Sequence, residues 1–186
     1  MKKSLTLIQM DVHVNDVEYN YNHVQELLTQ SLSESPDIIV LPETWNTGFY
    51  PSTDLINIAD NNGDRTKALL SAFAKEHNVN IVGGSVAVAK DNLVFNTSYV
   101  YNRNGELVGE YSKMHGFSPA KEDKYFASGT HTTHFELDGI PCSTIICYDI
   151  RFPELVRMAA LPGTELLFVP AQWPTMRLRH WQVLNE

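Results

Sequence analysis

Hydrophobic positions recur with two different periods along the first forty residues. Residues 5–10 and 37–41 are short apolar runs, which are typical of strands covered on both faces. Between them, residues 17–32 carry apolar side chains at spacings of three and four, which predicts an amphipathic helix. Asn15 precedes this segment and Glu18 follows it by three residues, so we expect Asn15 to cap the helix.

The same alternation continues through the rest of the chain. Gly83-Gly84 interrupts one apolar run and indicates a bulge or a close backbone approach. Asn104-Gly105 and Asp138-Gly139 each separate two extended runs and predict hairpins. The remaining predicted elements are a helix over 65–77, a strand region over 79–89, paired strands over 94–102 with 106–112 and 131–137 with 140–146, a helix over 153–160 and a strand over 164–169.

Strands joined by helices therefore alternate with strands joined by hairpins. This order predicts an α/β fold with mixed sheets and covering helices rather than a purely parallel sheet. No repeat, low-complexity segment or linker interrupts residues 1–186, so we expect a single domain.

Composition and charge exclude several classes of partner. With 43% hydrophobic and 19% charged residues the chain has the balance of a globular protein. Its net charge of −8, without a Lys/Arg run, does not suit binding to nucleic acid or to an anionic membrane. The apolar run after Lys2 and Lys3 is broken by Gln9 and Asp11 and is too short for a signal peptide, and no segment approaches the roughly 18 apolar residues of a membrane span. We expect a cytoplasmic protein.

The two cysteines, Cys142 and Cys147, lie five residues apart in a predicted strand. At ~3.3 Å per residue they would be roughly 16 Å apart, whereas a disulfide needs Cα atoms within about 7 Å. The odd offset points them to opposite faces. We therefore expect two free thiols, one of which can face a site.

Three residues with reactive side chains each follow a predicted strand, where α/β sheets tend to place their sites. They are Glu43, Lys113 and Cys147. Alone, Glu43 and Lys113 would be interpreted as solvated surface charges and Cys147 as a small core residue. Pro153 opens a helix soon after Cys147, so the thiol is expected on a tight turn between strand and helix.

The segments around these residues resemble the three catalytic motifs of the nitrilase (carbon–nitrogen hydrolase) superfamily. They are residues 41–45 (LPETW), 111–115 (YSKMH) and 146–154 (ICYDIRFPE), and both order and spacing match. The resemblance implies a four-layer αββα sandwich and a Glu43–Lys113–Cys147 triad. It also implies that Glu122 is a second glutamate at the site.

The implied chemistry is the hydrolysis of a small amide by water through a cysteine thioester. Lys113 would favour the thiolate, and Glu43 would take the thiol proton and later activate water. The Lys113 ammonium and the backbone N–H of Tyr148 would stabilise the oxyanion.

Residues 42–49 and 147–153 look most like the ω-amidase-type branch, whose members hydrolyse small dicarboxylate monoamides such as 2-oxoglutaramate. Arg151 is then either a carboxylate ligand or a structural residue paired to Asp149 or Glu154, and the sequence leaves both open. Phe49, Tyr125 and Trp173 are equally suited to line a pocket or to fill a core.

Metal and cofactor sites are not expected. His131 and His134 lie three apart in a predicted strand and so point to opposite faces, and no phosphate loop or dinucleotide fingerprint is present.

Two alternatives stay open. The chain could act on nitriles or N-carbamoyl compounds, as other branches do. It could also be an inactive fragment that serves as a subunit or binding module, because residues 179–186 resemble the start of a family helix that continues further. We expect a domain that is incomplete at its C-terminus, and a homodimer formed through residues 153–160, as is common in the family.

Overall fold

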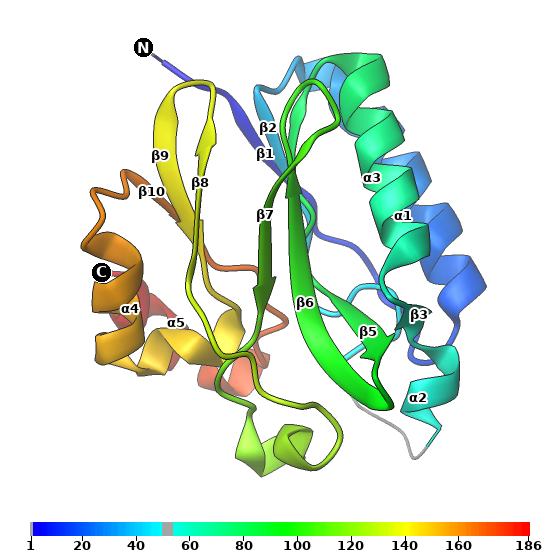
Figure 1. Cartoon of the computed structure of the whole chain (residues 1–186), viewed down its shortest axis with the longest axis vertical. Helices are drawn as coiled ribbons and strands as arrows, with labels where there is room; N and C mark the ends of the chain where they lie inside the picture. Colours follow the sequence, from blue (N-terminus) through cyan, green and yellow to red (C-terminus); the bar gives the residue numbers. More distant parts are fainter. Residues whose placement is uncertain (1, 50–53) are drawn as a thin grey trace.

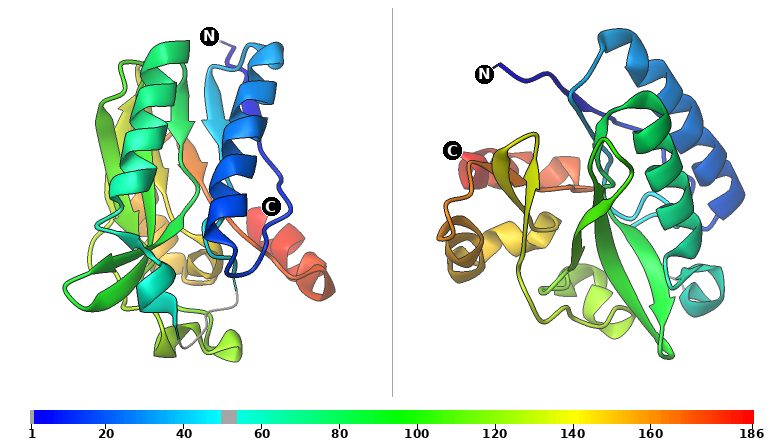
Figure 2. Two further views of the ribbon diagram at one scale, coloured as in Figure 1. Left: turned by 90° about the vertical axis from the view of Figure 1, so that its right-hand side faces the viewer. Right: turned by 45° about the horizontal axis from the view of Figure 1, so that its top comes forward.

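The structure is a computed structural model that describes residues 2–49 and 54–186. Two β-sheets face each other, with helices outside both (Figure 1). Helices α1 (Val17–Ser31) and α3 (Asp64–His77) cover the larger sheet, while α4 (Pro153–Ala160) and α5 (Leu178–Asn185) lie on the other side of the molecule (Figure 2). The expected four-layer αββα sandwich is confirmed.

Within the described residues the larger sheet has seven strands and the smaller sheet three. The larger contains β1 (Leu5–Leu7), β2 (Ile38–Val40), β3 (Asp60–Asn61), β4 (Asn80–Val82), β5 (Val86–Lys90), β6 (Leu93–Tyr101) and β7 (Leu107–Ser112). The smaller contains β8 (Thr133–Leu137), β9 (Ile140–Thr144) and β10 (Leu166–Phe168). A short helix α2 (Leu55–Ile58) and the 3₁₀ turns η1 (Leu32–Glu34), η2 (Ser118–Ala120), η3 (Glu122–Lys124), η4 (Cys147–Arg151) and η5 (Thr175–Arg177) complete the fold.

The predicted hairpins are the β6–β7 and β8–β9 pairs. Strands β1, β2 and β4 run parallel, while β6 pairs antiparallel with β4 near one end and with β5 near the other. The segment predicted as one strand region is thus two strands, broken at Gly83-Gly84. Gly84 has a φ of +62°, and a Cβ on it would lie 2.0 Å from the carbonyl oxygen of Pro42. The predicted close backbone approach is confirmed, and it holds the loop after β2 against the β4–β5 break.

Side chains on the two faces of the larger sheet pack into two separate hydrophobic cores. Tyr21, Leu28 and Leu70 from the helices pack on Ile39 and Ile81 outside the sheet. The space between the sheets is filled by Ile38, Val40, Val82, Val100, Phe135, Leu137, Cys142 and Phe168. None of the helices in residues 2–49 and 54–186 has the length and apolar content needed to cross a bilayer.

The predicted cap of the first helix is wrong by one residue. Asp16, not Asn15, is the N-cap, and its Oδ1 accepts a hydrogen bond from the Tyr19 N–H at 3.1 Å. Asn15 instead adopts a left-handed φ of +63° in the preceding turn. Both residue types suit either role, so sequence preference alone could not separate them.

The predicted strand through Cys142 and Cys147 ends earlier than expected. β9 stops at Thr144, and the Cys147 N–H donates to the Pro170 carbonyl at 2.9 Å before the chain turns into η4. The opposite-face argument therefore does not apply to Cys147, which has left the strand. Both cysteines are nevertheless free and buried, Cys142 in the core between the sheets.

Candidate active site

The structure brings together the four residues expected to carry chemistry. Glu43, Lys113 and Cys147 follow β2, β7 and β9, and Glu122 lies in η3. Their exposed fractions are 0%, 3%, 4% and 1% in the order Glu43, Lys113, Cys147, Glu122. Ionisable groups are seldom buried this deeply without partners, so their contacts determine what the site can do.

Lys113 lies between the two glutamates. Its Nζ donates to Glu43 Oε1 at 2.8 Å and to Glu122 Oε1 and Oε2 at 2.9 and 2.8 Å. Burial alone would lower the pKa of Lys113, but the nearby Glu43, Cys147 and Glu122 groups outweigh it and hold that pKa above its ordinary value. The ammonium therefore stays charged inside the protein.

Other groups fix the two carboxylates. Asn96 on β6 donates through Nδ2 to Glu43 at 3.1 Å and to Glu122 at 3.2 Å. The backbone N–H of Gln172 donates to Glu43 Oε2 at 2.9 Å, and that of Phe117 to Glu122 Oε2 at 2.7 Å. Sequence analysis missed these three residues. The only available signal was an asparagine inside a strand, since Phe117 and Gln172 reach the carboxylates through their backbone N–H groups.

Cys147 rests as a neutral thiol. Burial and the Glu43 carboxylate raise the pKa of Cys147 well above its ordinary value, and Lys113 only partly opposes them. Lys113 favours the thiolate, as expected, but its effect is smaller than those of burial and Glu43. A hydrogen bond with Glu43 also favours the protonated thiol. The Glu43 carboxylate thus lies beside the proton of the thiol.

The thiol lies on a strained turn. Cys147 has a φ of +48°, in the left-handed region that a residue with a Cβ seldom adopts. Thr44, directly after Glu43, is also left-handed with a φ of +43°. The elbow expected between β9 and α4 is confirmed, and Pro153 is in the first turn of α4.

Asp149 joins the turn of Cys147 to the loop of Lys113. It is fully buried and accepts hydrogen bonds from the Tyr111 hydroxyl at 2.7 Å and the Ile146 N–H at 3.0 Å. It also accepts the His115 N–H and lies 2.9 Å from His115 Nδ1. Among the described residues Arg151 pairs with neither Asp149 nor Glu154, and its Nη2 lies against His180 instead.

A hollow opens beside Cys147. Besides Cys147, four of its lining residues were predicted at the site, namely Phe49, Tyr148, Arg151 and Trp173. Phe117, Gln172, Pro174 and Arg177 line it without having been predicted.

Tyr125 does not line this hollow, contrary to the expectation. It packs instead with the cluster of Leu55, Ala87 and Val94, where its apolar ring is partly covered. Residues close to Glu122 in sequence thus need not share its site, because the chain turns at η3.

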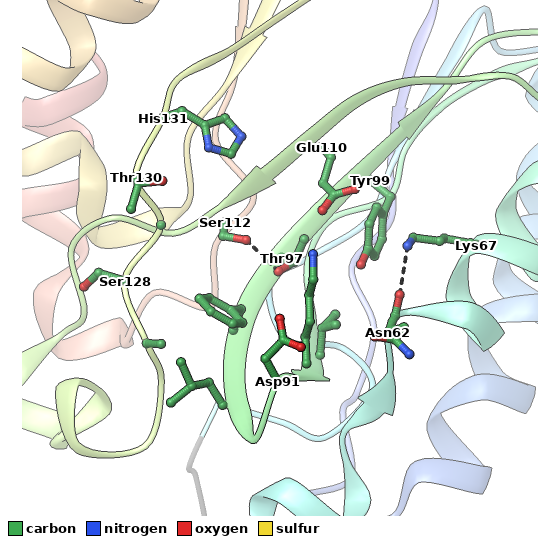
Figure 3. Close-up of a pocket in the computed structure, with 16 residues that line it drawn as sticks. Asn62, Lys67, Asp91, Thr97, Tyr99, Glu110, Ser112, Ser128, Thr130 and His131 are labelled. Atoms are coloured by element: carbon green, nitrogen blue, oxygen red, sulfur yellow. Dashed lines mark hydrogen bonds between the residues drawn. The ribbon is translucent and has the colours of Figure 1, made fainter.

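A larger hollow lies on the opposite face of β6 (Figure 3). Thr97 and Tyr99 face it, together with Glu110, Ser112 and His131. Asn96 points the other way, toward Glu43 and Glu122, so the sheet separates this hollow from those two carboxylates. Among the described residues no group of three or more His, Cys, Asp or Glu side chains is arranged to hold a metal ion.

The chain is similar to known proteins in sequence and in structure. The sequence profile of the carbon–nitrogen hydrolase family matches residues 4–186. A 2-oxoglutaramate amidase of Bacillus subtilis is 40% identical over 184 residues, which cover 99% of this chain and 70% of the relative. A hydrolase in the agr operon of Staphylococcus aureus is 35% identical over 180 residues, 96% of this chain and 69% of the relative. The structure of a carbon–nitrogen hydrolase superfamily protein from Xanthomonas campestris, with an arsenic adduct in its active site, superposes with a TM-score of 0.86 at 29% identity, over 99% of this chain and 70% of that one.

Proposed function

The chain belongs to the carbon–nitrogen hydrolase family, and from that premise we propose that it hydrolyses the terminal amide of a small dicarboxylate monoamide such as 2-oxoglutaramate. Glu43, Lys113 and Cys147 form the proposed triad. The observation that carries the proposal is a neutral thiol buried beside a carboxylate and a permanently charged ammonium.

In the first half of the proposed reaction, Cys147 Sγ attacks the amide carbon while Glu43 takes the thiol proton. The carbonyl oxygen becomes an oxyanion, stabilised by the Lys113 ammonium and the Tyr148 N–H. When the C–N bond breaks, Glu43 gives its proton to the departing nitrogen, so ammonia leaves and a thioester remains.

In the second half Glu43 is again a base. It takes a proton from water, whose oxygen attacks the thioester carbon, and the second oxyanion occupies the same site beside Lys113. The C–S bond then breaks, sulfur regains the proton, and the acid product leaves. Glu122, with both oxygens on Lys113, keeps the ammonium in place beside the oxyanion.

Two observations support the proposed substrate. The relative from Bacillus subtilis is named a 2-oxoglutaramate amidase. Arg151 lines the hollow beside Cys147, where a guanidinium can bind a carboxylate through two hydrogen bonds. Phe49 and Trp173 provide apolar walls for a short methylene chain.

The test is ammonia release by the purified chain from 2-oxoglutaramate, a simple nitrile and an N-carbamoyl amino acid. We expect turnover of 2-oxoglutaramate, and none by Cys147→Ala. A preference for the nitrile or the carbamoyl compound would contradict the proposed substrate. Equal rates for the wild-type chain and Cys147→Ala would contradict the proposed nucleophile.

We also propose that the chain forms a homodimer through α4. Met158 on this helix and Leu161, which directly follows it, are 52% and 76% exposed, which leaves apolar surface open beside the elbow. Light scattering of the wild-type chain and of Met158→Lys tests this, with a fall in mass expected for the variant. An unchanged mass would contradict it.

A further inference from the structure

The hollow beside Cys147 carries two positive charges. Arg151 and Arg177 both line it, and none of the described residues that line it is Asp or Glu. Neither guanidinium forms an ion pair in the part of the chain that the structure describes. Two cations that share a partly buried hollow repel each other unless an anion joins them.

Arg151 is positioned by contacts with two other side chains. Its Nη2 lies 3.0 Å from His180 Nδ1, and its Cζ lies 5.6 Å from the ring centre of Trp173. Its Nε is buried and has no hydrogen-bond partner. A buried donor without a partner is costly, so this side chain has unused binding capacity.

Arg177 reaches the same hollow from η5. Its Cζ lies 4.9 Å from the ring centre of Phe117, and its backbone carbonyl accepts a hydrogen bond from Trp173 Nε1 at 2.8 Å. Trp173 therefore contacts both arginines, one through its ring and the other through its N–H. The Trp173 ring faces the Arg151 guanidinium, while its N–H fixes the backbone of Arg177, whose guanidinium lies over Phe117.

We infer that Arg177 is a second specificity-determining residue, which together with Arg151 binds the anionic end of the substrate. This rests on the function proposed above and extends it. A carboxylate fits one guanidinium through two parallel hydrogen bonds. A 2-oxo group beside that carboxylate adds a further acceptor, which gives the second guanidinium a partner. The substrate class is thus a short amide whose far end is a 2-oxo carboxylate.

The charges also set the direction of binding. Glu43 and Glu122 outnumber Lys113 at the inner end of the site, whereas the arginines lie at the hollow. An anionic group is repelled from the first position and attracted to the second. The amide is therefore directed to Cys147 and the carboxylate away from it.

The experiment compares three amides of equal chain length. They are 2-oxoglutaramate, glutaramate, which lacks the oxo group, and pentanamide, which lacks the charge. For Arg177→Gln we expect the ratio of kcat/KM for 2-oxoglutaramate to that for pentanamide to fall roughly 10- to 100-fold, mainly through KM. The ratio for 2-oxoglutaramate to glutaramate should fall as well. Arg179→Gln, an exposed arginine two residues further on, is the matched control and should keep both ratios.

A binding measurement separates this inference from catalysis. In the Cys147→Ala background, Arg177→Gln should weaken the affinity for 2-oxoglutarate, measured by calorimetry, by a similar factor. If Arg177→Gln does not fold, Arg177→Lys replaces it and should still lose at least about threefold, because a compact ammonium cannot form the paired contact.

The outcomes distinguish the two proposals. A wild-type enzyme that prefers pentanamide overturns the proposed function. A wild-type enzyme that prefers 2-oxoglutaramate, with both ratios and the 2-oxoglutarate affinity unchanged in the Arg177 variant, overturns only the role of Arg177.

Discussion

At the scale of single residues, Lys113 is the centre of the site. It contacts both glutamates, and its charge lowers the pKa of Cys147 against the effects of burial and Glu43. Groups that act as one unit lose most of their effect when any one is removed, and a second removal then costs little.

We therefore predict that Lys113→Ala and Glu43→Gln each reduce kcat by several orders of magnitude and combine non-additively. Lys113→Arg should not restore the rate, because a planar guanidinium cannot place charge at the point where the ammonium now meets two carboxylates. Ammonia release by the two single variants and the double variant is the measurement. If the fold-loss in kcat of the double variant equals the product of the two single fold-losses, Lys113 and Glu43 do not act as one unit.

A second prediction concerns the thiols and alkaline pH. Burial raises the pKa of Cys142 to about 11 and that of Cys147 further above its ordinary range. In the unfolded chain both ionise near pH 8.5. The unfolded state then binds fewer protons than the folded one, so the free energy of unfolding falls as pH rises above that value.

Each cysteine should contribute about 1.4 kcal/mol per pH unit to this slope once the unfolded thiol is ionised. Cys147→Ala should therefore reduce the slope with which the free energy of unfolding falls between pH 9 and 10, measured by urea denaturation. Cys142→Ala should do the same and also cost stability through its cavity in the core between the sheets. Identical slopes in wild type and Cys147→Ala would show that the folded thiol ionises normally.

The sequence could predict those residues of the site whose side chains are themselves reactive. Glu43, Lys113 and Cys147 have reactive side chains at strand ends, so motif and placement agreed. Asn96 is a neutral amide, and Gln172 binds Glu43 through its backbone as well as its side chain. Their part in the site depends on pairings between segments far apart in sequence, which periodicity cannot reveal.

At the scale of elements, Asp149 connects η4 to the end of β7. Its four contacts come from residues on either side of Lys113 and from Ile146, next to Cys147. The position of the thiol relative to the ammonium therefore depends on this carboxylate.

We predict that Asp149→Asn lowers the free energy of unfolding by about 2 kcal/mol, because a buried acceptor of several hydrogen bonds becomes partly a donor. It should also lower kcat up to ~100-fold, since a displacement of even ~1 Å can have that effect. Thermal melting and ammonia release are the measurements. Asp123→Asn, an exposed acid on η3, is the control. Full activity in Asp149→Asn would show that other contacts fix η4.

At this scale the sequence predicted most helices and hairpins but placed some of their ends wrongly. The strand through Cys142 was extended to Ile146 because the apolar run continues there. Ile145 and Cys147 still donate to the Phe168 and Pro170 carbonyls, and the chain then turns into η4 at Cys147, where φ is +48°. Apolar residues occur beside the site as well as in strands, so hydrophobicity does not show where β9 ends.

At the scale of the whole molecule, the two sheets are joined by charge as well as by their shared core. Asp138, in the β8–β9 turn, accepts hydrogen bonds at 2.8 Å from Arg103 Nε, Arg103 Nη2 and Lys3 Nζ. Arg103, in the β6–β7 turn, also donates to Asp37, which precedes β2. Neither periodicity nor turn chemistry predicted this link, because it joins three turns that only the layered arrangement brings together.

This link predicts how the protein responds to acid. Hydrogen bonds from Arg103 and Lys3 outweigh the effect of burial and hold the pKa of Asp138 well below its ordinary value, and the Ser4 N–H, Lys3 and Arg103 lower that of Asp37. A carboxylate with a lowered pKa stabilises the fold above its unfolded pKa of about 3.9. The contribution is lost as pH falls below that value. Because solvent reaches the pairs, we expect Asp138→Asn to lower the free energy of unfolding by only about 1 kcal/mol at pH 7.

The difference between wild type and Asp138→Asn should therefore be constant from pH 7 to about 5 and shrink below pH 4, where Asp138 takes up a proton in the unfolded chain while it stays ionised in the folded one. Urea denaturation at several pH values measures it. Asp91→Asn is the matched control, an exposed acid in the β5–β6 turn whose φ of +52° an asparagine also tolerates. High salt should weaken the Asp138 effect only in part, because the pairs are partly shielded from solvent. A difference that persists unchanged at pH 2 would mean that Asp138 holds the sheets together by packing rather than by its charge.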